Sequence, residues 1–176
     1  MIRFDQDSAE CRVLTFKEGI LSAIAHDLVL RVGRFEVEVE PERRSVVGVF
    51  AADSLRVVDA ARAGEPVPGV LTAANKAEIE SNVSRWVLEP DRHPEIRYAS
   101  TSVAETPGGG FVVDGVLRLH GEERSLRAEV RRDGARHVAR ATVHQPDFGI
   151  RPYTALLGTL RVRADVEVRL LLPDRA

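Results

Sequence analysis

The chain has 176 residues and a nearly balanced charge, with 25 Lys and Arg residues, 27 Asp and Glu residues and a net charge of −2. Apolar residues make up 44% of the chain and charged residues 30%, a mixture typical of a folded globular protein and not of a disordered one. The lack of a basic excess argues against nucleic-acid binding, and no apolar run approaches the ~20 residues needed to span a bilayer.

The N-terminal segment contains two acids within its first eight residues and lacks the apolar core of a secretory signal. It also holds the one cysteine of the chain, Cys11, which excludes an internal disulfide and gives no sign of an oxidising compartment. A buried, unreactive side chain is the expectation for Cys11. We therefore expect a single cytoplasmic domain over residues 1–176, or a periplasmic one if a leader has been removed.

A long bent strand is predicted over residues 25–40. Its apolar positions are even-numbered as far as Val32 and odd-numbered from Phe35 onward, and the phase changes at Gly33. A β-bulge produces such a change, because one extra residue returns the following side chains to their original face. A strand of this kind is typical of a sheet that curls.

Further strands and one helix follow along the chain. The helix is expected over residues 75–88, with Asn75 and Glu78 as its N-cap pair and an apolar stripe that includes Ile79, Val83 and Trp86 or Val87. The other strands are expected at residues 12–16, 45–51, 95–104, 111–119, 125–131 and 136–143. Short, turn-forming connectors make neighbouring strands antiparallel.

The C-terminal part combines an apolar loop with a strand. Residues 145–160 carry Phe148, Tyr153 and Leu156, whose side chains must be buried somewhere, either at the end of the fold or in a partner. Residues 161–170 then alternate strictly between charged and apolar side chains. This period of two predicts a strand with one wet face and one dry face.

The predicted elements define an all-β protein with one amphipathic helix, either a closed antiparallel barrel or a sandwich. A barrel has no edge strands, and about eight strands are enough to enclose a cavity. A sandwich usually has no such cavity, so the two architectures imply different functions.

Several ordered motifs make the chain similar to the bacterial YceI-like family. Residues 93–100 (HPEIRYAS) resemble the family's Pro-x-Ile-x-Phe-x-Ser strand, with Tyr98 at the aromatic position, and residues 113–121 (VDGVLRLHG) resemble its Gly-x-Leu-x-Leu-His-Gly hairpin. Residues 84–88 and the pair Phe148-Gly149 also match in order. The resemblance implies a lipocalin-like antiparallel barrel that binds polyisoprenoids or similar long-chain lipids.

The predicted function is therefore non-covalent binding of a long apolar ligand, such as a polyisoprenoid, a quinone or a fatty-acid-like lipid. No cofactor is expected. A lipid carrier needs an apolar interior for the tail and a few polar groups for the head. His26 is the candidate for the head, and the loop over residues 145–160 is the candidate lid. The candidate ligand-binding residues are His26, Leu28, Leu30, Val32, Phe35, Leu117, Leu119, Phe148, Tyr153, Leu156, Val166 and Val168.

Three alternatives stay open from the residues alone. An enzyme acting on an apolar substrate would use His26 and Asp27, although neighbours on a strand point to opposite faces and no Gly-x-Ser-x-Gly elbow occurs. A metal site would gather distant histidines, none of which has a ligand-type spacing. A barrel filled by its own side chains would instead be an interaction or homodimerisation module.

Overall fold

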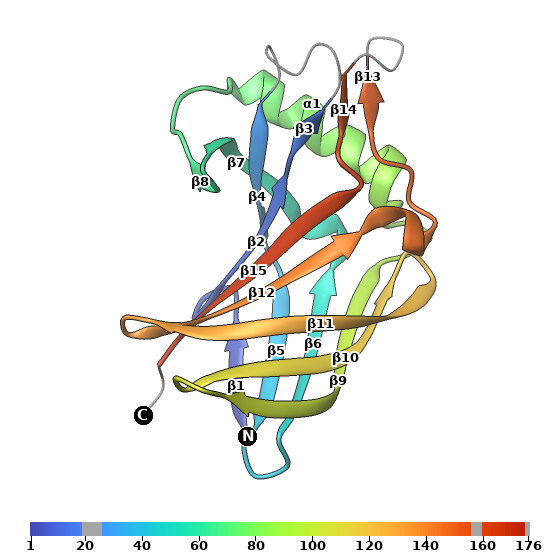
Figure 1. Cartoon of the computed structure of the whole chain (residues 1–176). Helices are drawn as coiled ribbons and strands as arrows, with labels where there is room; N and C mark the ends of the chain where they lie inside the picture. The colour runs from blue at the N-terminus through green and yellow to red at the C-terminus, as the bar shows by residue number, and fades with distance from the viewer. Residues whose placement is uncertain (19–25, 156–159, 175–176) are drawn as a thin grey trace.

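The computed structural model describes residues 1–18, 26–155 and 160–174. A strongly curled antiparallel sheet forms the body, and the helix α1 (Ala73–Val83) lies across one end of it (Figure 1). We call the end next to α1 the upper end. The lower end holds the turns that join β5 to β6, β9 to β10 and β11 to β12 (Figure 1). The predicted all-β class and its lipocalin-like architecture are confirmed.

The main sheet contains twelve strand segments, and a small sheet of three segments lies at the upper end. The main sheet consists of β1 (Ile2–Asp5), β2 (Glu10–Thr15), β4 (Asp27–Val32), β5 (Phe35–Glu40), β6 (Ser45–Ala51), β7 (Leu55–Arg62), β8 (Glu65–Pro66), β9 (Glu95–Thr106), β10 (Gly110–Leu119), β11 (Glu122–Asp133), β12 (Arg136–His144) and β15 (Asp165–Pro173). The small sheet consists of β3 (Lys17–Glu18), β13 (Thr154–Ala155) and β14 (Leu160–Val162).

The number of segments exceeds the expected count of about eight because three stretches of chain are each divided in two. The three stretches are β1 with β2, β4 with β5, and β6 with β7. Both halves of the first stretch pair with the second, since β1 pairs with β5 and β2 pairs with β4. The pairings then run from β6 through β9, β10, β11, β12 and β15 back to β2. The order of strands thus returns to its starting point, as in a barrel.

The predicted long strand over residues 25–40 is divided at Gly33 and Arg34, which lie between β4 and β5. The backbone N–H of Gly33 donates to the Ser54 carbonyl at 2.8 Å, and the backbone N–H of Arg34 donates to the Ser54 hydroxyl at 3.0 Å. A Cβ at Gly33 would lie 2.9 Å from that carbonyl oxygen, so the close approach requires glycine. Ser54 is the last residue of the short turn η1 (Ala52–Ser54), which divides β6 from β7. The break between β4 and β5 and the break between β6 and β7 therefore lie side by side.

The helix begins at Ala73, before the predicted N-cap Asn75, so the predicted N-cap was wrong. Thr72 is the N-cap: its hydroxyl accepts the Asn75 N–H at 3.1 Å, and the Asn75 side chain accepts the Thr72 N–H at 3.2 Å. Asn75 is therefore the third helical residue. The helix continues into a wider turn, η2 (Ser84–Leu88), which rotates Val87 toward the barrel and leaves Trp86 62% exposed.

The alternating stretch over residues 161–170 is also divided, because Arg163 and Ala164 leave the strand. The Arg163 N–H donates to the carbonyl of Phe16 at 2.8 Å, and the Ala164 carbonyl accepts the N–H of Gln145 at 2.9 Å. The parity is nevertheless kept, since Val162, Val166, Val168 and Leu170 all face the interior. Period two correctly identified the dry face but not the break in the strand.

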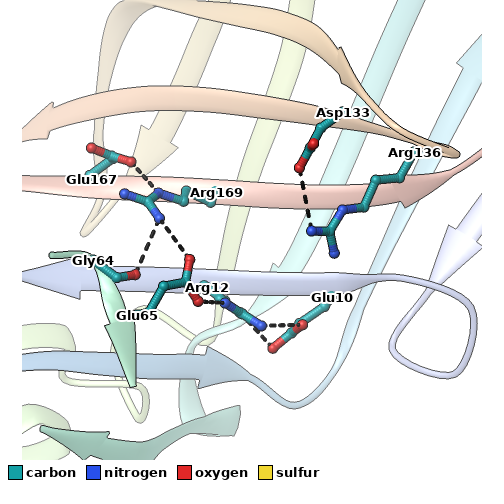
Figure 2. Close-up of polar contacts among 8 residues, drawn as sticks. All are labelled: Glu10, Arg12, Gly64, Glu65, Asp133, Arg136, Glu167 and Arg169. Atoms are coloured by element: carbon teal, nitrogen blue, oxygen red, sulfur yellow. Dashed lines mark hydrogen bonds and ion pairs between the residues drawn. The ribbon is translucent and has the colours of Figure 1, made fainter. Parts of the chain in front are cut away.

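Charged side chains join the short β7–β8 hairpin to the outer face of the barrel (Figure 2). Glu65 lies 3.0 Å from Arg12 on β2 and 3.6 Å from Arg169 on β15. Arg169 also donates to the Gly64 carbonyl at 3.2 Å and pairs with Glu167. The two arginine side chains are only 19% and 15% exposed, so they lie against the sheet, whereas Glu65 itself is 66% exposed.

Candidate functional site

A cavity of about 1170 Å³ extends along the inside of the barrel. Its wall includes residues from both ends of the molecule, from His26 and Ile79 at the upper end to Arg132 and Asp174 at the lower end. Between these ends the wall is formed by inward-facing aliphatic and aromatic side chains of the main sheet. The interior is therefore a long apolar chamber.

Small side chains in the wall keep the chamber open. Ala128 on β11 and Ala139 and Ala141 on β12 all face inward, and so does Gly48 on β6. The inward residues of β11 are only half-buried although they lie inside the barrel, because they face the cavity and not a packed core. This geometry differs from a barrel filled by its own side chains.

Most of the predicted ligand-binding residues lie in the cavity wall: His26, Leu28, Leu30, Val32, Leu117, Leu119, Tyr153, Val166 and Val168. Phe35 and Phe148 do not, although both are buried. Phe35 is stacked against Phe50 at a centroid distance of 5.9 Å, and Phe50 is the ring that meets the cavity. Phe148 packs in the apolar cluster around Leu117 and Leu119. Leu156 lies outside the described residues.

His26 and Asp27 point to different surroundings, as alternation along a strand requires. His26 is exposed and borders the upper part of the cavity. The Asp27 carboxylate accepts the backbone N–H of Lys17 at 2.9 Å and thereby joins β4 to β3. This bond gives Asp27 a structural role.

The upper end of the cavity is covered by α1 and η2, whose Ile79, Val83 and Val87 side chains face inward. The Asn82 side chain also lines the cavity and donates to the hydroxyl of Tyr153 at 3.2 Å. This bond joins the helix to the loop that precedes β13. Sequence reasoning identified Tyr153 but missed Asn82, because an asparagine on a helix gives no periodic pattern.

A buried carboxylate, Asp59 on β7, holds the start of the helix in place. It accepts the backbone N–H groups of Ala60, Gly69 and Leu71 at 2.8–2.9 Å and lies 3.2 Å from the Lys76 ammonium. Burial by itself raises the pKa of Asp59, but these hydrogen bonds outweigh it and hold the pKa well below its usual range. The carboxylate is thus charged and fully bonded under the helix, a feature that the sequence analysis also missed.

Two ionisable side chains in the cavity wall are held neutral. Burial, together with the charge of Glu10, raises the pKa of Cys11 to about 12. Burial, together with the charge of Asp114, raises the pKa of Tyr98 to about 12. The Tyr98 hydroxyl donates to the Val113 carbonyl at 3.1 Å, beside a β-bulge in β10, so its polar atom is turned toward backbone. Neither group is a nucleophile at neutral pH.

The histidines are dispersed around the barrel, and the described part of the chain contains no group of three His, Cys, Asp or Glu side chains placed to hold a metal. His93 and His120 are neighbours, with ring centroids 4.4 Å apart. His120 Nε2 lies 2.8 Å from a Glu89 oxygen and thereby joins η2 to the β10–β11 turn. Across residues 1–18, 26–155 and 160–174, no helix is long and apolar enough to cross a bilayer.

A curled antiparallel barrel that encloses an apolar chamber and is covered by one helix defines a lipocalin-like protein. The YceI-like domain matches residues 23–172, most of the chain. The chain therefore belongs to the YceI-like family. A comparison with curated proteins gave no match.

Two solved structures share this fold at low sequence identity. BcnA of Burkholderia cenocepacia has a TM-score of 0.62 and 14% identity, with 97% of this chain and 99% of that chain covered. A polyisoprenoid-binding domain from Saccharophagus degradans, implicated in plant cell wall breakdown, has a TM-score of 0.57 and 12% identity, with 94% and 92% of the two chains covered. These similarities show that the chain shares the fold of these two proteins.

Proposed function

We propose that this protein binds a long apolar molecule inside the barrel, without covalent chemistry, and carries, stores or shields it. The observation that carries the proposal is the apolar chamber of about 1170 Å³ whose wall is kept open by small side chains. Membership of the YceI-like family and the polyisoprenoid-binding domain of Saccharophagus degradans support a ligand of this class. Polyisoprenoids, quinones and fatty-acid-like lipids all have the required tail.

The volume of the chamber sets an upper limit on the size of the ligand. At about 30 Å³ for each water-sized group, 1170 Å³ has room for roughly forty carbon-sized groups. Burial of about a dozen methylenes contributes about 10 kcal/mol, which is similar to the estimated association cost of about 4–15 kcal/mol. A chain of intermediate length therefore binds without a dense set of polar contacts, and chamber length becomes the main determinant of specificity.

Native mass spectrometry of the protein, followed by organic extraction and lipid analysis, tests this function directly. We expect a co-purifying apolar molecule of no more than roughly forty non-hydrogen atoms in the chamber, at one molecule per chain. A protein that carries no such molecule, takes up none from a panel of prenols, quinones and fatty acids, and hydrolyses a test ester would instead support the enzyme alternative.

A pair of variants on β12 tests whether the ligand lies in the chamber and not on the outer face of the sheet. Ala141→Phe places a ring in the chamber, whereas Thr142→Phe adds the same ring to the exposed outer face one residue away. We expect Ala141→Phe to weaken binding of a C20 prenol about tenfold or more, because a ring removes the volume of several methylene groups, each worth about 0.8 kcal/mol. Equal binding by the two variants would contradict a ligand in the chamber.

A further inference from the structure

The lower end of the chamber differs chemically from the rest of its wall. Three adjacent strands, β11, β12 and β15, present apolar side chains inward along most of their length and then change to ionisable ones at the same level. The inward positions at this level are Arg132 at the end of β11, His137 at the start of β12 and Asp174 just after β15. Arg132 and His137 are direct partners in the β11–β12 register.

Two more ionisable residues extend this set along the same end. Glu105 is the inward residue near the end of β9, and Arg44 lies in the turn between β5 and β6. Their side chains form an ion pair at 3.6 Å. We call these five residues, Arg44, Glu105, Arg132, His137 and Asp174, the lower ring.

Asp174 occupies the centre of the cationic part of the lower ring. Its carboxylate lies 2.6 Å from Arg132 Nη2 and 2.9 Å from His137 Nδ1. Its backbone N–H donates to the Ala135 carbonyl at 3.0 Å, so the carboxylate is held between the two donors by the chain itself. Asp174 is 27% exposed and follows the last strand, where a side-chain rotation disturbs no sheet pairing.

The upper end is closed by an apolar cover. This cover contributes Ile79, Val83 and Val87, and the Asn82 side chain there is already bonded to Tyr153. A hydrocarbon terminus fits against such a cover, whereas a charged group would lose its hydration there without compensation.

Ionisable residues also border the chamber at this end. They are Lys17, His26 and Arg161, and Arg161 pairs with Glu18 at 3.0 Å. The apolar cover, and not an absence of ionisable groups, therefore distinguishes the upper end from the lower one.

From the lower ring and the apolar cover we infer that the ligand is an amphiphile with an anionic head, a carboxylate or a phosphate, which binds at the lower ring while its tail points toward α1. Arg132 and His137 donate to the head, and Asp174 is the internal anion that the head displaces. Charge-assisted hydrogen bonds from a guanidinium and an imidazole are the interactions that such heads prefer. This inference rests on the proposed function, because it requires the tail to lie in the chamber.

Three probes with the same tail test the assignment: hexadecanoate, hexadecyl phosphate and hexadecan-1-ol. We expect the wild-type protein to bind both anionic probes about tenfold more tightly than the neutral alcohol. Arg132→Gln should remove this preference while affinity for the alcohol stays unchanged, and Asp174→Asn should strengthen binding of the anionic probes. Arg131→Gln is the matched control, because Arg131 lies next to Arg132 on the opposite face of β11, outside the chamber wall, and both side chains are mostly exposed, at 81% and 65%.

The outcomes separate this inference from the proposed function. Binding of none of the three probes would contradict the proposed function itself. Equal binding of all three, unaffected by Arg132→Gln, would support an apolar chamber and overturn the head assignment. Loss of the preference in His26→Gln instead of Arg132→Gln would place the head at the upper end, and displacement of hexadecyl phosphate by inorganic phosphate would assign the lower ring to a free anion.

Discussion

Three polar residues of this barrel join neighbouring elements. Asp27 bonds the backbone of β3, Asp59 bonds the loop before α1, and His120 bonds Glu89. In each case the side chain is already engaged by a neighbour. The middle of the chamber wall is formed by apolar residues, which a non-covalent lipid site requires.

The His93 and His120 pair predicts how stability depends on pH. Burial, and then the charge of His120, lower the pKa of His93 below its usual 6.5. The unfolded chain binds this proton at about pH 6.5, whereas the folded chain binds it only at lower pH, so stability falls as the pH drops through this range. We expect His93→Gln to reduce the fall in Tm between about pH 7 and pH 5.

The measurement is a series of thermal melts followed by circular dichroism in buffers of constant ionic strength. Parallel pH curves for the wild type and His93→Gln would show that His93 has the same proton affinity in both states. A variant curve that is steeper than the wild-type curve would reverse the sign of the argument.

At the scale of elements, the outer face is stabilised by the ion network that joins β8 to β2 and β15 (Figure 2). Glu65 provides both contacts from the short hairpin, and the arginines that it meets are largely covered. Networks with half-buried partners are worth more than isolated surface pairs, which contribute about 0–1 kcal/mol. Apart from this network, the β7–β8 hairpin is held by the pairing of Ala61 with Pro66 and of Arg62 with Glu65.

Glu65→Gln is therefore expected to destabilise the protein by about 0.5–1 kcal/mol, the upper part of the range for such pairs. For a chain of this length the change corresponds to a fall in Tm of about 1–4 °C. The difference should shrink in about 1 M salt, where charges are screened over about 3 Å. Urea denaturation at low and high salt measures both effects.

Glu129→Gln is the control for this prediction, because Glu129 also pairs with an arginine, Arg131, but both side chains are more than half exposed. It should change stability by less than about 0.5 kcal/mol. A Glu65→Gln effect no larger than that of the control would mean that the hairpin network does not contribute to folding.

At the scale of the whole molecule, a barrel with an internal chamber gives up part of the packing that stabilises ordinary domains. Its core is divided into two apolar clusters, one around Phe4 and Val37 and one around Leu117 and Phe148. Residues of both clusters, such as Val37 and Leu117, line the chamber. On the proposed function, a tail held there extends the contacts of both clusters and so couples ligand binding to folding stability.

This coupling predicts that removal of the bound lipid lowers the melting temperature. A ligand at about 100 times its Kd stabilises the native state by about 2.7 kcal/mol, which for this chain length is a shift in Tm of about 5–10 °C. Differential scanning calorimetry of extracted protein, before and after addition of a prenol, measures the shift. Stoichiometric uptake without any rise in Tm would show that the lipid binds the unfolded chain as tightly as the folded one, which contradicts a site formed by the barrel.

Local sequence patterns determined which side chains face inward on most strands. Val166 and Val168 on β15, and Leu28 and Leu30 on β4, were placed correctly because a strand alternates its faces with a period of two regardless of its neighbours. β7 was missed because its sequence does not alternate: Asp59 and two further residues, Val57 and Ala60, are buried. Leu55–Arg62 thus has no continuous wet face to mark it as a strand.

Only the tertiary structure decided that the barrel contains a chamber, which ionisable side chains meet at its lower end, and what joins α1 to the sheet. Each of these features depends on residues far apart in the chain, such as Arg132 with Asp174 or Asp59 with Lys76. The chamber itself follows from how far apart opposing strands are held by bends and bulges, and no local pattern encodes that separation. The sequence by itself therefore determined the faces of the strands, whereas the space between those faces was decided by closure of the sheet.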